Sequence, residues 1–237
     1  MRFRFRNRKL NLRRCLVPDG YFQMGSEGNA FDEAPVREIY VSAFEMAVTP
    51  LTNRDYALYL KKTKADPPPW WDDPDFSDPQ QPVVGVNWYE ACKYCEWLTK
   101  VSGYSFRLPT EAEWEKAARG GHRSFDYPWG QDMNGSGLES ASGPRKAPCI
   151  VGQGRTNGYG LKDMVLNIHQ WCQGGYDSQY YIDCPEVNPP GSPNMEQCSA
   201  RGESWNSEVL VCRCAARSRL APYFRCNDYG FRWVRTF

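Results

Sequence analysis

The chain has 237 residues, with 29 basic and 28 acidic side chains and a formal net charge of +1. A chain of this length can bury a real core without a metal ion or disulfide, yet it is short enough to form one domain. The balanced charge excludes a protein whose overall field draws it to nucleic acid or to an acidic membrane. No apolar run reaches the roughly 18 residues that a membrane-spanning helix needs, so we expect a soluble chain with no membrane span.

The N-terminal segment is the one strongly basic region, with seven basic residues and no acid between Arg2 and Arg14. Alternation through residues 2–8 predicts an edge strand with a solvated basic face. A contact with nucleic acid or phosphate is the alternative interpretation. No signal-peptide core follows this segment. We therefore expect a cytoplasmic protein if Met1 is the native start, and a surface-displayed one if an export signal has been removed.

Further elements follow in chain order. Alternation predicts strands at 21–25 and 37–41, and Thr52 or Asn53 is the expected N-cap of a first helix. The proline-rich stretch 66–74 is incompatible with a helix interior and is predicted to be a loop.

Two more helices have clear boundaries. Apolar residues recur at helical spacing from Asn87 to Thr99, and Gly103 follows the end of this helix. A capping box at 110–113 begins the next helix, which stops at Gly120. Beyond Phe125 the abundance of glycine, proline and asparagine predicts irregular structure and brief strands, with a final strand at 230–234.

The chain contains ten cysteines and two histidines, His122 and His169. Cys92 and Cys95 fall on one face of the second predicted helix, where we expect them to pack as small apolar residues. A zinc or redox role is the alternative, but neither histidine lies at zinc-finger spacing from a partner.

Several short motifs occur in order along the chain, at residues 24–26, 50–56, 81–91, 107–121, 127–130, 157–161 and 230–232. In these motifs the chain resembles the formylglycine-generating enzyme (sulfatase-modifying factor) family over about residues 17–234. This resemblance implies an α+β, C-type lectin-like fold of the formylglycine-generating enzyme type, with few helices, short strands and many ordered loops. We expect a single domain over 1–237, and an ion pair between Arg107 and Glu113 that pins a loop to a helix.

In members that oxidise a sulfatase cysteine, the resemblance implies two cysteines, five residues apart, that bind copper(I) and the substrate thiol in the final segment. Alignment on Trp205 puts this pair at Ser207 and Cys212, whereas alignment on 214–217 puts it at Ser204 and Val209. Neither alignment yields the two soft thiolates that copper(I) requires. Iron-dependent relatives need three histidines, and the chain has two. We therefore expect a pseudoenzyme with no catalytic residues.

The family's structural calcium site is also altered. Gln170 replaces the glutamate and Leu166 the glycine of the usual motif, so that Asp163 and Gln170 remain as weak calcium candidates. We expect no other cofactor. His169 replaces a tryptophan and is expected to face solvent.

The C-terminal segment 201–233 also resembles that of the variable proteins of diversity-generating retroelements, in which a stretch ending near Gly-Phe-Arg is rewritten by adenine mutation. Such mutation of asparagine-type codons cannot produce Lys, Gln, Glu, Met or Trp. Residues 206–229 contain Glu208 and none of the other four types. The resemblance thus implies a variable ligand-binding segment.

We expect Leu210, Val211 and Ala215 to be strand core. The predicted exposed ligand-binding residues are Asn206, Ser207, Val209, Arg219, Leu220, Tyr223, Phe224, Asn227, Asp228 and Tyr229. Mixed aromatic, aliphatic and arginine side chains are typical of protein-binding patches. The sequence therefore predicts a monomeric, non-catalytic protein that binds a protein or other surface ligand and no nucleic acid. A divergent formylglycine-generating (sulfatase-activating) oxidase is the alternative.

Overall fold

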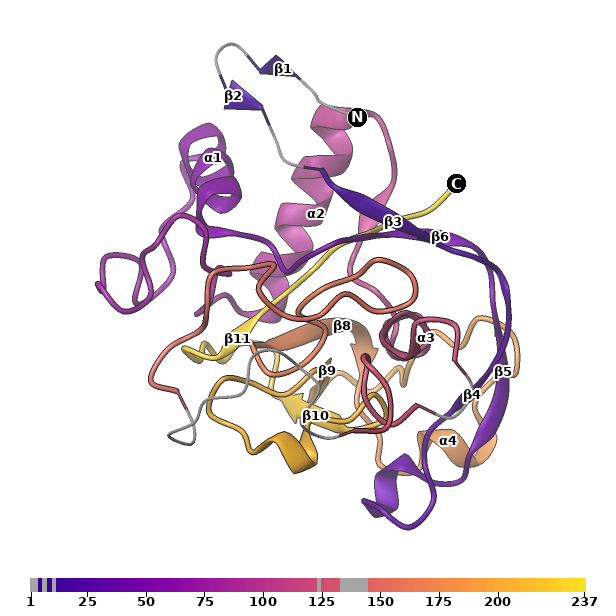
Figure 1. Ribbon diagram of the computed structural model, residues 1–237. Helices are drawn as coiled ribbons and strands as arrows, with labels where there is room; N and C mark the ends of the chain where they lie inside the picture. Colours follow the sequence, from indigo (N-terminus) through magenta and orange to yellow (C-terminus); the bar gives the residue numbers. More distant parts are fainter. Residues whose placement is uncertain (1–3, 6–7, 10–11, 123–124, 133–144) are drawn as a thin grey trace.

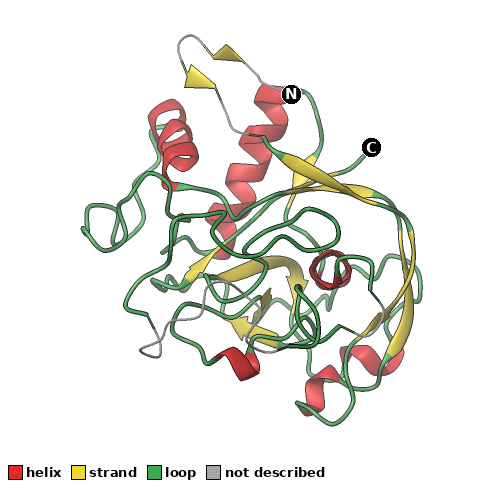
Figure 2. Cartoon of the chain, viewed as in Figure 1, coloured by secondary structure: helices red, strands yellow, loops and turns green. Residues whose placement is uncertain are grey.

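The structure is a computed structural model, which describes residues 4–5, 8–9, 12–122, 125–132 and 145–237. Loops and turns dominate the chain (Figure 2). The helices are α1 (Asn53–Thr63), α2 (Trp88–Ser102), α3 (Glu111–Arg119) and α4 (Tyr180–Asp183). The strands are β1 (Arg4–Phe5), β2 (Arg8–Lys9), β3 (Arg14–Val17), β4 (Gly20–Met24), β5 (Arg37–Val41), β6 (Phe44–Ala47), β7 (Phe106–Arg107), β8 (His169–Gly175), β9 (Cys198–Arg201), β10 (Arg217–Leu220), β11 (Tyr229–Gly230) and β12 (Val234–Arg235).

One sheet joins the two ends of the described chain. Its order is β3-β6-β12-β7, so that the early strand β3 and the last strand β12 both pair with β6. β3 and β6 run together across one side of the molecule and continue into the β4–β5 hairpin (Figure 1). β6 therefore lies between an early strand and the last strand of the chain.

A second sheet is formed by the later part of the chain, in the order β10-β9-β8-β11. β9 pairs antiparallel with β8 and β10, and β11 pairs parallel with β8. Helix α3, seen end-on in Figure 1, packs against β8 and β9 on one side and against β4 and β5 on the other. This helix therefore links the N-terminal hairpin to the sheet that carries the C-terminal segment.

The predicted helix signals are confirmed. Thr52 caps α1, and capping boxes start α2 at Asn87 and α3 at Thr110. Gly103 and Gly120 end α2 and α3 in the left-handed conformation, which glycine adopts without steric cost. At Gly120 a Cβ atom would also lie 2.7 Å from the Gly158 nitrogen, so a side chain would collide with the neighbouring loop.

Large tryptophans fill a core that has little regular structure around it. Trp114, Trp171 and Trp233 are fully buried. The indole nitrogen of Trp171 donates to the Val86 carbonyl oxygen at 2.9 Å, and that of Trp114 donates to the side-chain oxygen of Gln170 at 3.0 Å. Each ring therefore buries a large apolar area while its polar atom fixes a neighbouring segment.

Two strand predictions were wrong in detail. Residues 4–5 and 8–9 form two short strands that pair with each other, so they are not parts of one straight strand, and residues 2–3 and 6–7 of the predicted strand lie outside the described residues. The expected strand 230–234 is broken because Arg232 turns inward and is fully buried. Its guanidinium donates to the backbone carbonyls of Ala47 and Asp163. The chain therefore forms two strands in place of one: β11, before Arg232, pairs with β8, and β12, after it, pairs with β6 and β7.

Cys92 and Cys95 lie on α2, and the apolar role expected of them agrees with their surroundings. Burial raises the pKa of the Cys92 thiol to about 12, and it raises the pKa of Cys95 well above its usual value. Thiols that stay protonated are poor metal ligands and poor nucleophiles. Within the described part of the chain, no helix combines the length and apolar character needed to cross a bilayer.

The cap of α3 provides a first test. The Thr110 hydroxyl accepts from the Glu113 backbone nitrogen at 3.2 Å, so Thr110→Ala should lower the free energy of unfolding by about 1 kcal/mol. Thr110→Ser keeps the acceptor and should stay close to wild type in urea unfolding. Equal stability of the alanine and serine variants would contradict this role.

Candidate functional site

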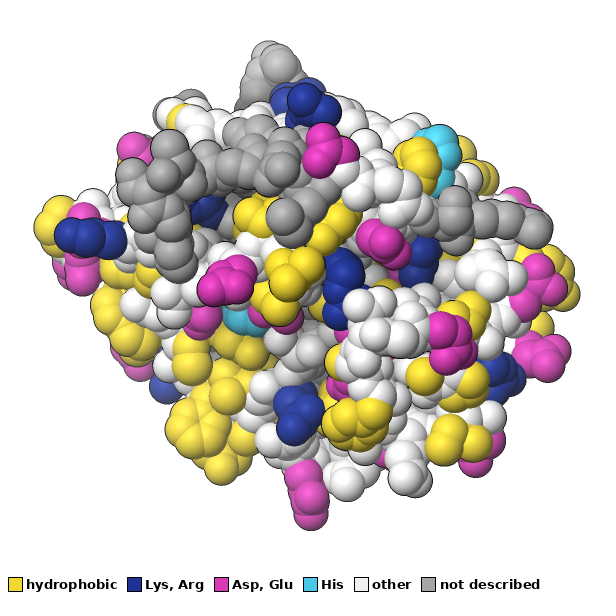
Figure 3. All heavy atoms as spheres, turned by 60° about the horizontal axis from the view of Figure 1, so that its bottom comes forward, with side chains coloured by type: hydrophobic (Ala, Val, Ile, Leu, Met, Phe, Trp, Pro, Cys, Tyr) yellow, Lys and Arg dark blue, Asp and Glu magenta, His cyan; other side chains and the backbone are white. Residues whose placement is uncertain are grey.

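The candidate ligand-binding surface is built on the β9–β10 hairpin and the loop that follows it. β9 and β10 pair from Arg201 with Arg217 to Cys198 with Leu220. Their long connection, 202–216, contains the short 3-10 helix η2 (Val209–Val211), and a second loop, 221–228, leads to β11. We call these two connections the C-terminal loops. They lie on the lower side of the molecule in Figure 1, and Figure 3 turns that side toward the viewer.

Most of the predicted ligand-binding residues reach the surface. Asn206, Arg219, Tyr223 and Phe224 are exposed, as expected. The half-buried ones are Ser207, Val209, Leu220, Asn227 and Asp228. The structure thus leaves nine of the ten predicted residues at least partly exposed on β10 and the C-terminal loops, and their role as ligand contacts stays a prediction.

The prediction that Tyr229 is exposed was wrong, because it is only 8% exposed. Its ring stacks on His169 at a centroid distance of 4.5 Å and tilts against Trp171 at 5.0 Å. Residue 229 already belongs to β11, which pairs with β8, so the Tyr229 side chain packs on the sheet below the loops.

The prediction that Leu210 and Val211 are strand core was also wrong. Their side chains are 62% and 44% exposed on η2, where the Cys212 nitrogen donates to the Val209 carbonyl and closes a tight turn. A short apolar run cannot by itself distinguish a buried strand from an exposed turn. Ala215 is buried as expected, but it lies in a turn and not in a strand. Leu210 and Val211 therefore join the candidate surface.

The second C-terminal loop presents two aromatic rings. Tyr223 and Phe224 are 64% and 49% exposed, and their rings stack at 4.9 Å. The loop is fixed to the start of α2, since Arg225 donates to Glu90 at 2.7 Å and the Trp88 backbone nitrogen donates to the Pro222 carbonyl at 3.0 Å. Hydrophobic side chains gather in separate groups among charged ones on the face shown in Figure 3. Exposed aromatic rings on an anchored backbone suit a binding surface.

His169 lies beneath this surface and does not face solvent, contrary to the sequence prediction. Its Nε2 atom is 3.7 Å from the Glu203 carboxylate and 3.8 Å from that of Asp228. The hydroxyls of Ser207 and Ser218 donate to Glu203, and that of Ser204 donates to Asp228. Both carboxylates therefore have fixed positions between the two C-terminal loops.

A buried charge network holds the hairpin below this surface. It consists of Glu111, Glu115 and Arg119 on α3, and Arg201 and Arg217 on β9 and β10. Arg201 donates to Glu111 at 3.0 Å and to Glu115 at 2.7 Å. Arg217 binds both oxygens of Glu111, and Arg119 binds Glu115. These charged side chains are almost completely excluded from solvent.

The network lowers the pKa of Glu111. Burial by itself raises the pKa of Glu111, but the charges of Arg217 and Arg201 outweigh it and lower this pKa to about 2. Arg201 also donates to the carbonyls of Cys214 and Ala216 at 3.0 Å each. The network therefore fixes the backbone of the first C-terminal loop as well as the strands.

The cysteines of this segment face inward. Cys212 is fully buried, and its thiol donates to the Glu208 carbonyl oxygen at 3.1 Å. Burial, followed by the nearby Glu203 carboxylate, raises the pKa of Cys212. Burial likewise raises the pKa of Cys214 to about 12. All ten cysteines are free of disulfides, and among the described residues no group of three or more Cys, His, Asp or Glu could hold a metal ion.

The weak calcium candidates Asp163 and Gln170 do not fit that ion. The Asp163 carboxylate accepts from the backbone nitrogens of Gly152 and Gly154. The Gln170 side chain uses its oxygen to accept from Trp114 and Arg232, and its nitrogen donates to two backbone carbonyls. The Arg232 guanidinium already supplies a positive charge beside the Asp163 carbonyl. Asp163, Gln170 and Arg232 therefore form a hydrogen-bonded cluster that connects the loop before β8 to the C-terminal segment.

Comparison with known proteins agrees with the motifs. The family model of the sulfatase-modifying factor enzyme 1-like domain matches residues 4–237. The chain is 32% identical over 241 residues to the serine/threonine-protein kinase pkn1 of Chlamydia pneumoniae, a match that covers 93% of this chain and 37% of the kinase. It thus spans little more than a third of that relative. It is 29% identical over 278 residues to the formylglycine-generating enzyme of Streptomyces coelicolor, covering 91% of this chain and 87% of the enzyme.

Among solved structures, the fold is similar to that of Treponema denticola variable protein 1. The TM-score is 0.83 at 21% sequence identity, over 99% of this chain and 98% of the other. The predicted fold class, a C-type lectin-like arrangement of few helices, short strands and many ordered loops, is confirmed.

The charge network predicts a specific response to acid. The folded-state pKa of Glu111, about 2, lies below the value of about 4.3 expected when unfolded, so its stabilisation is complete above about pH 4.3 and is lost as pH falls toward 2. Glu111→Gln should lower the free energy of unfolding at pH 7 by about 3–5 kcal/mol, because buried Arg217 loses its carboxylate partner and Arg201 loses one of its two. It should also flatten the pH dependence of stability between about pH 5 and 2.

Glu38→Gln is the matched control, because Glu38 is an exposed glutamate on β5. Denaturant unfolding at several pH values measures both variants. If Glu111→Gln kept the acid dependence and stability of Glu38→Gln, the proposed energetics of the network would be wrong.

Proposed function

Because this chain belongs to the family of sulfatase-modifying factor enzyme 1-like domains, we propose that it is a member that binds ligands and does not oxidise sulfatase cysteines. The segment 201–233 carries the proposed ligand surface within a single domain over residues 1–237. The ligand is a protein or another surface that contacts the C-terminal loops.

The observation that carries this proposal is the state of Cys212. Copper(I) chemistry in this family implies two accessible thiolates on one loop, and metal binding by cysteine requires loss of the thiol proton. Cys212 is buried, and its pKa is raised. Alignment on Trp205 gives Ser207 as its partner, whose hydroxyl donates to Glu203 at 3.2 Å. One protonated thiol and one alcohol do not make a copper(I) site.

The surface chemistry supports binding. Asn206, Leu210, Tyr223 and Phe224 are exposed on the C-terminal loops, and Arg219 is exposed on the neighbouring strand β10. Aromatic and arginine side chains are enriched at protein interfaces and supply much of their binding energy. The charge network holds the backbone below, so that little conformational entropy is lost when a ligand binds.

We further propose that this surface is diversified, as in the variable proteins of retroelements. The scarcity of residue types that adenine mutation cannot produce supports this interpretation, as does the exposure of most of the proposed ligand residues. A nearby reverse transcriptase gene together with a near-duplicate of the 3′ coding end is the genomic pattern expected. Absence of both from the complete genome would refute diversification while leaving the binding function intact.

Copper(I) uptake separates the binding function from the divergent oxidase. Purified wild type and Cys212→Ser should retain equally little copper(I) in competition with a chelator, and neither should oxidise a cysteine-containing sulfatase peptide. Stoichiometric copper(I) binding that Cys212→Ser abolishes, accompanied by peptide turnover in wild type, would establish the oxidase in place of the binding protein.

Variation of the surface should leave the fold intact. Alanine at Asn206, Tyr223 or Phe224 should change the free energy of unfolding by no more than about 0.5 kcal/mol, as is usual for exposed positions. Tyr229→Ala is the comparison, because this buried ring should cost about 3–5 kcal/mol. Urea unfolding measures both. A large loss of stability at several of the exposed positions would mean that this surface cannot vary freely.

A further inference from the structure

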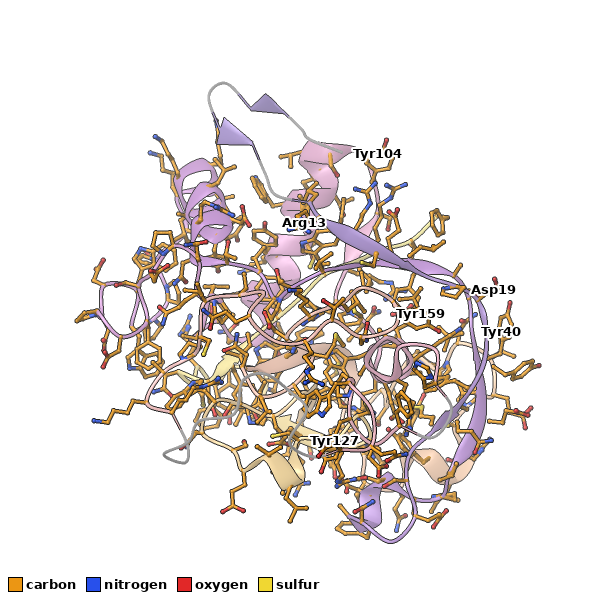
Figure 4. All side chains as sticks on the ribbon, in the orientation of Figure 1. Arg13, Asp19, Tyr40, Tyr104, Tyr127 and Tyr159 are labelled. Carbon is orange, nitrogen blue, oxygen red and sulfur yellow. The ribbon has the colours of Figure 1, made fainter. Side chains whose placement is uncertain are left out.

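A second site lies away from the C-terminal loops. A cavity of about 290 Å³ opens where the end of β6, the first turn of α1 and the loop at 151–162 meet. None of its lining residues belongs to the C-terminal loops at 202–216 and 221–228, and Figure 4 shows Arg13, one of these lining residues, near β3. The cavity therefore does not belong to the proposed ligand surface.

The charged side chains that line this cavity are mostly positive. Three are basic, Arg13, Arg54 and Lys162, and one is acidic, Asp55, so their formal charges add to +2. Arg13 is exposed and forms no ion pair with a carboxylate of the described residues. Arg54 is 52% exposed and only reaches Asp55 at 4.0 Å, the outer limit of an ion pair. Both guanidinium groups are thus available to an anion.

Lys162 and the start of α1 also form hydrogen bonds within the protein. The Lys162 ammonium donates to the Gly152 carbonyl oxygen at 2.9 Å, which holds it at the cavity and leaves two of its protons. The first backbone nitrogens of α1 are occupied, since that of Asn53 donates to Gln81 and that of Arg54 donates to Pro79. Anion recognition here therefore depends on side chains and not on the helix N-terminus.

We propose that this cavity binds a phosphate monoester. Its volume is at the lower end of the range of about 300–1,000 Å³ that ligand pockets occupy, so it suits a small anionic group. A phosphate monoester carries a charge of about −1.5 to −2 at pH 7, which matches the +2 of the lining residues. The planar guanidinium of arginine binds two oxygens of such a group at once.

The phosphate can come from a small molecule or from a phosphorylated side chain of a partner. Inorganic phosphate, O-phosphoserine and a phosphoserine peptide are the probes, titrated into the full chain by calorimetry at about 50 mM salt, where such contacts are weakly screened. We expect saturable binding of one phosphate group per chain. An affinity for the peptide at least about tenfold above that for O-phosphoserine would identify a partner chain as the source, and equal affinities would identify a small molecule.

Arg13→Ala and Arg54→Ala should each weaken phosphate binding by about tenfold or more, the effect of removing one charge-assisted hydrogen bond. Lys61→Ala is the matched control, because Lys61 is an exposed cation of the same helix outside the cavity. Circular dichroism checks that each variant folds. The proposal is overturned if wild type shows no saturable binding up to about 10 mM phosphate, or if Arg13→Ala and Arg54→Ala bind as tightly as Lys61→Ala.

Discussion

The charge network of Glu111, Glu115, Arg119, Arg201 and Arg217 ties α3 to the two strands that carry the C-terminal loops. Burying charges costs several kcal/mol per ion, and that cost is offset only where geometry and hydrogen bonds are close to ideal. Here Glu111 forms ion pairs with both arginines of the hairpin, Arg201 and Arg217. Glu115 forms ion pairs with Arg201 and Arg119. Shifting the hairpin along α3 would leave buried charges without partners. The network therefore selects one register for β9 and β10.

This constraint separates the segment 201–233 into a fixed frame and a changeable surface. Arg201 and Arg217 bind backbone carbonyls of neighbouring loops as well as acids, so the loop backbone is held from inside. Cys212 and Cys214 pack inward with it, which gives them a structural role and leaves their pKa values raised. Asn206, Leu210 and Tyr223 are exposed on the outside of the same loops and do not belong to this network. Exposed side chains on these loops can therefore be substituted, which changes the ligand that the proposed surface binds, while the buried network keeps the fold stable.

Much of the fold was predictable because its signals are local. The capping boxes at Asn87 and Thr110, the terminating Gly120 and the ion pair between Arg107 and Glu113 each depend on residues close in sequence, and all are present. The acidic partners of Arg201 and Arg217 lie 86–106 positions away along the chain, so sequence spacing could not indicate them.

The candidate surface was predictable only in part, for a similar reason. Polar and aromatic residues after β10 gave the correct expectation of exposure for Tyr223 and Phe224. The sequence does not indicate that η2 turns Leu210 outward, or that pairing of β11 with β8 buries Tyr229 and His169. The exposure of Leu210 and the burial of Tyr229 and His169 depend on how distant segments of the chain pack against each other. Local sequence patterns do not specify that packing.

Native-state hydrogen exchange tests the division into frame and surface most directly. Backbone amides bonded within β9 and β10 should exchange only through global unfolding, with an opening free energy equal to the free energy of unfolding. Amides of η2 and of residues 221–228 should open locally and exchange at least about 100-fold faster. If the amides of β9 and β10 exchanged as fast as those of the C-terminal loops, the hairpin would not be the rigid support that this account requires.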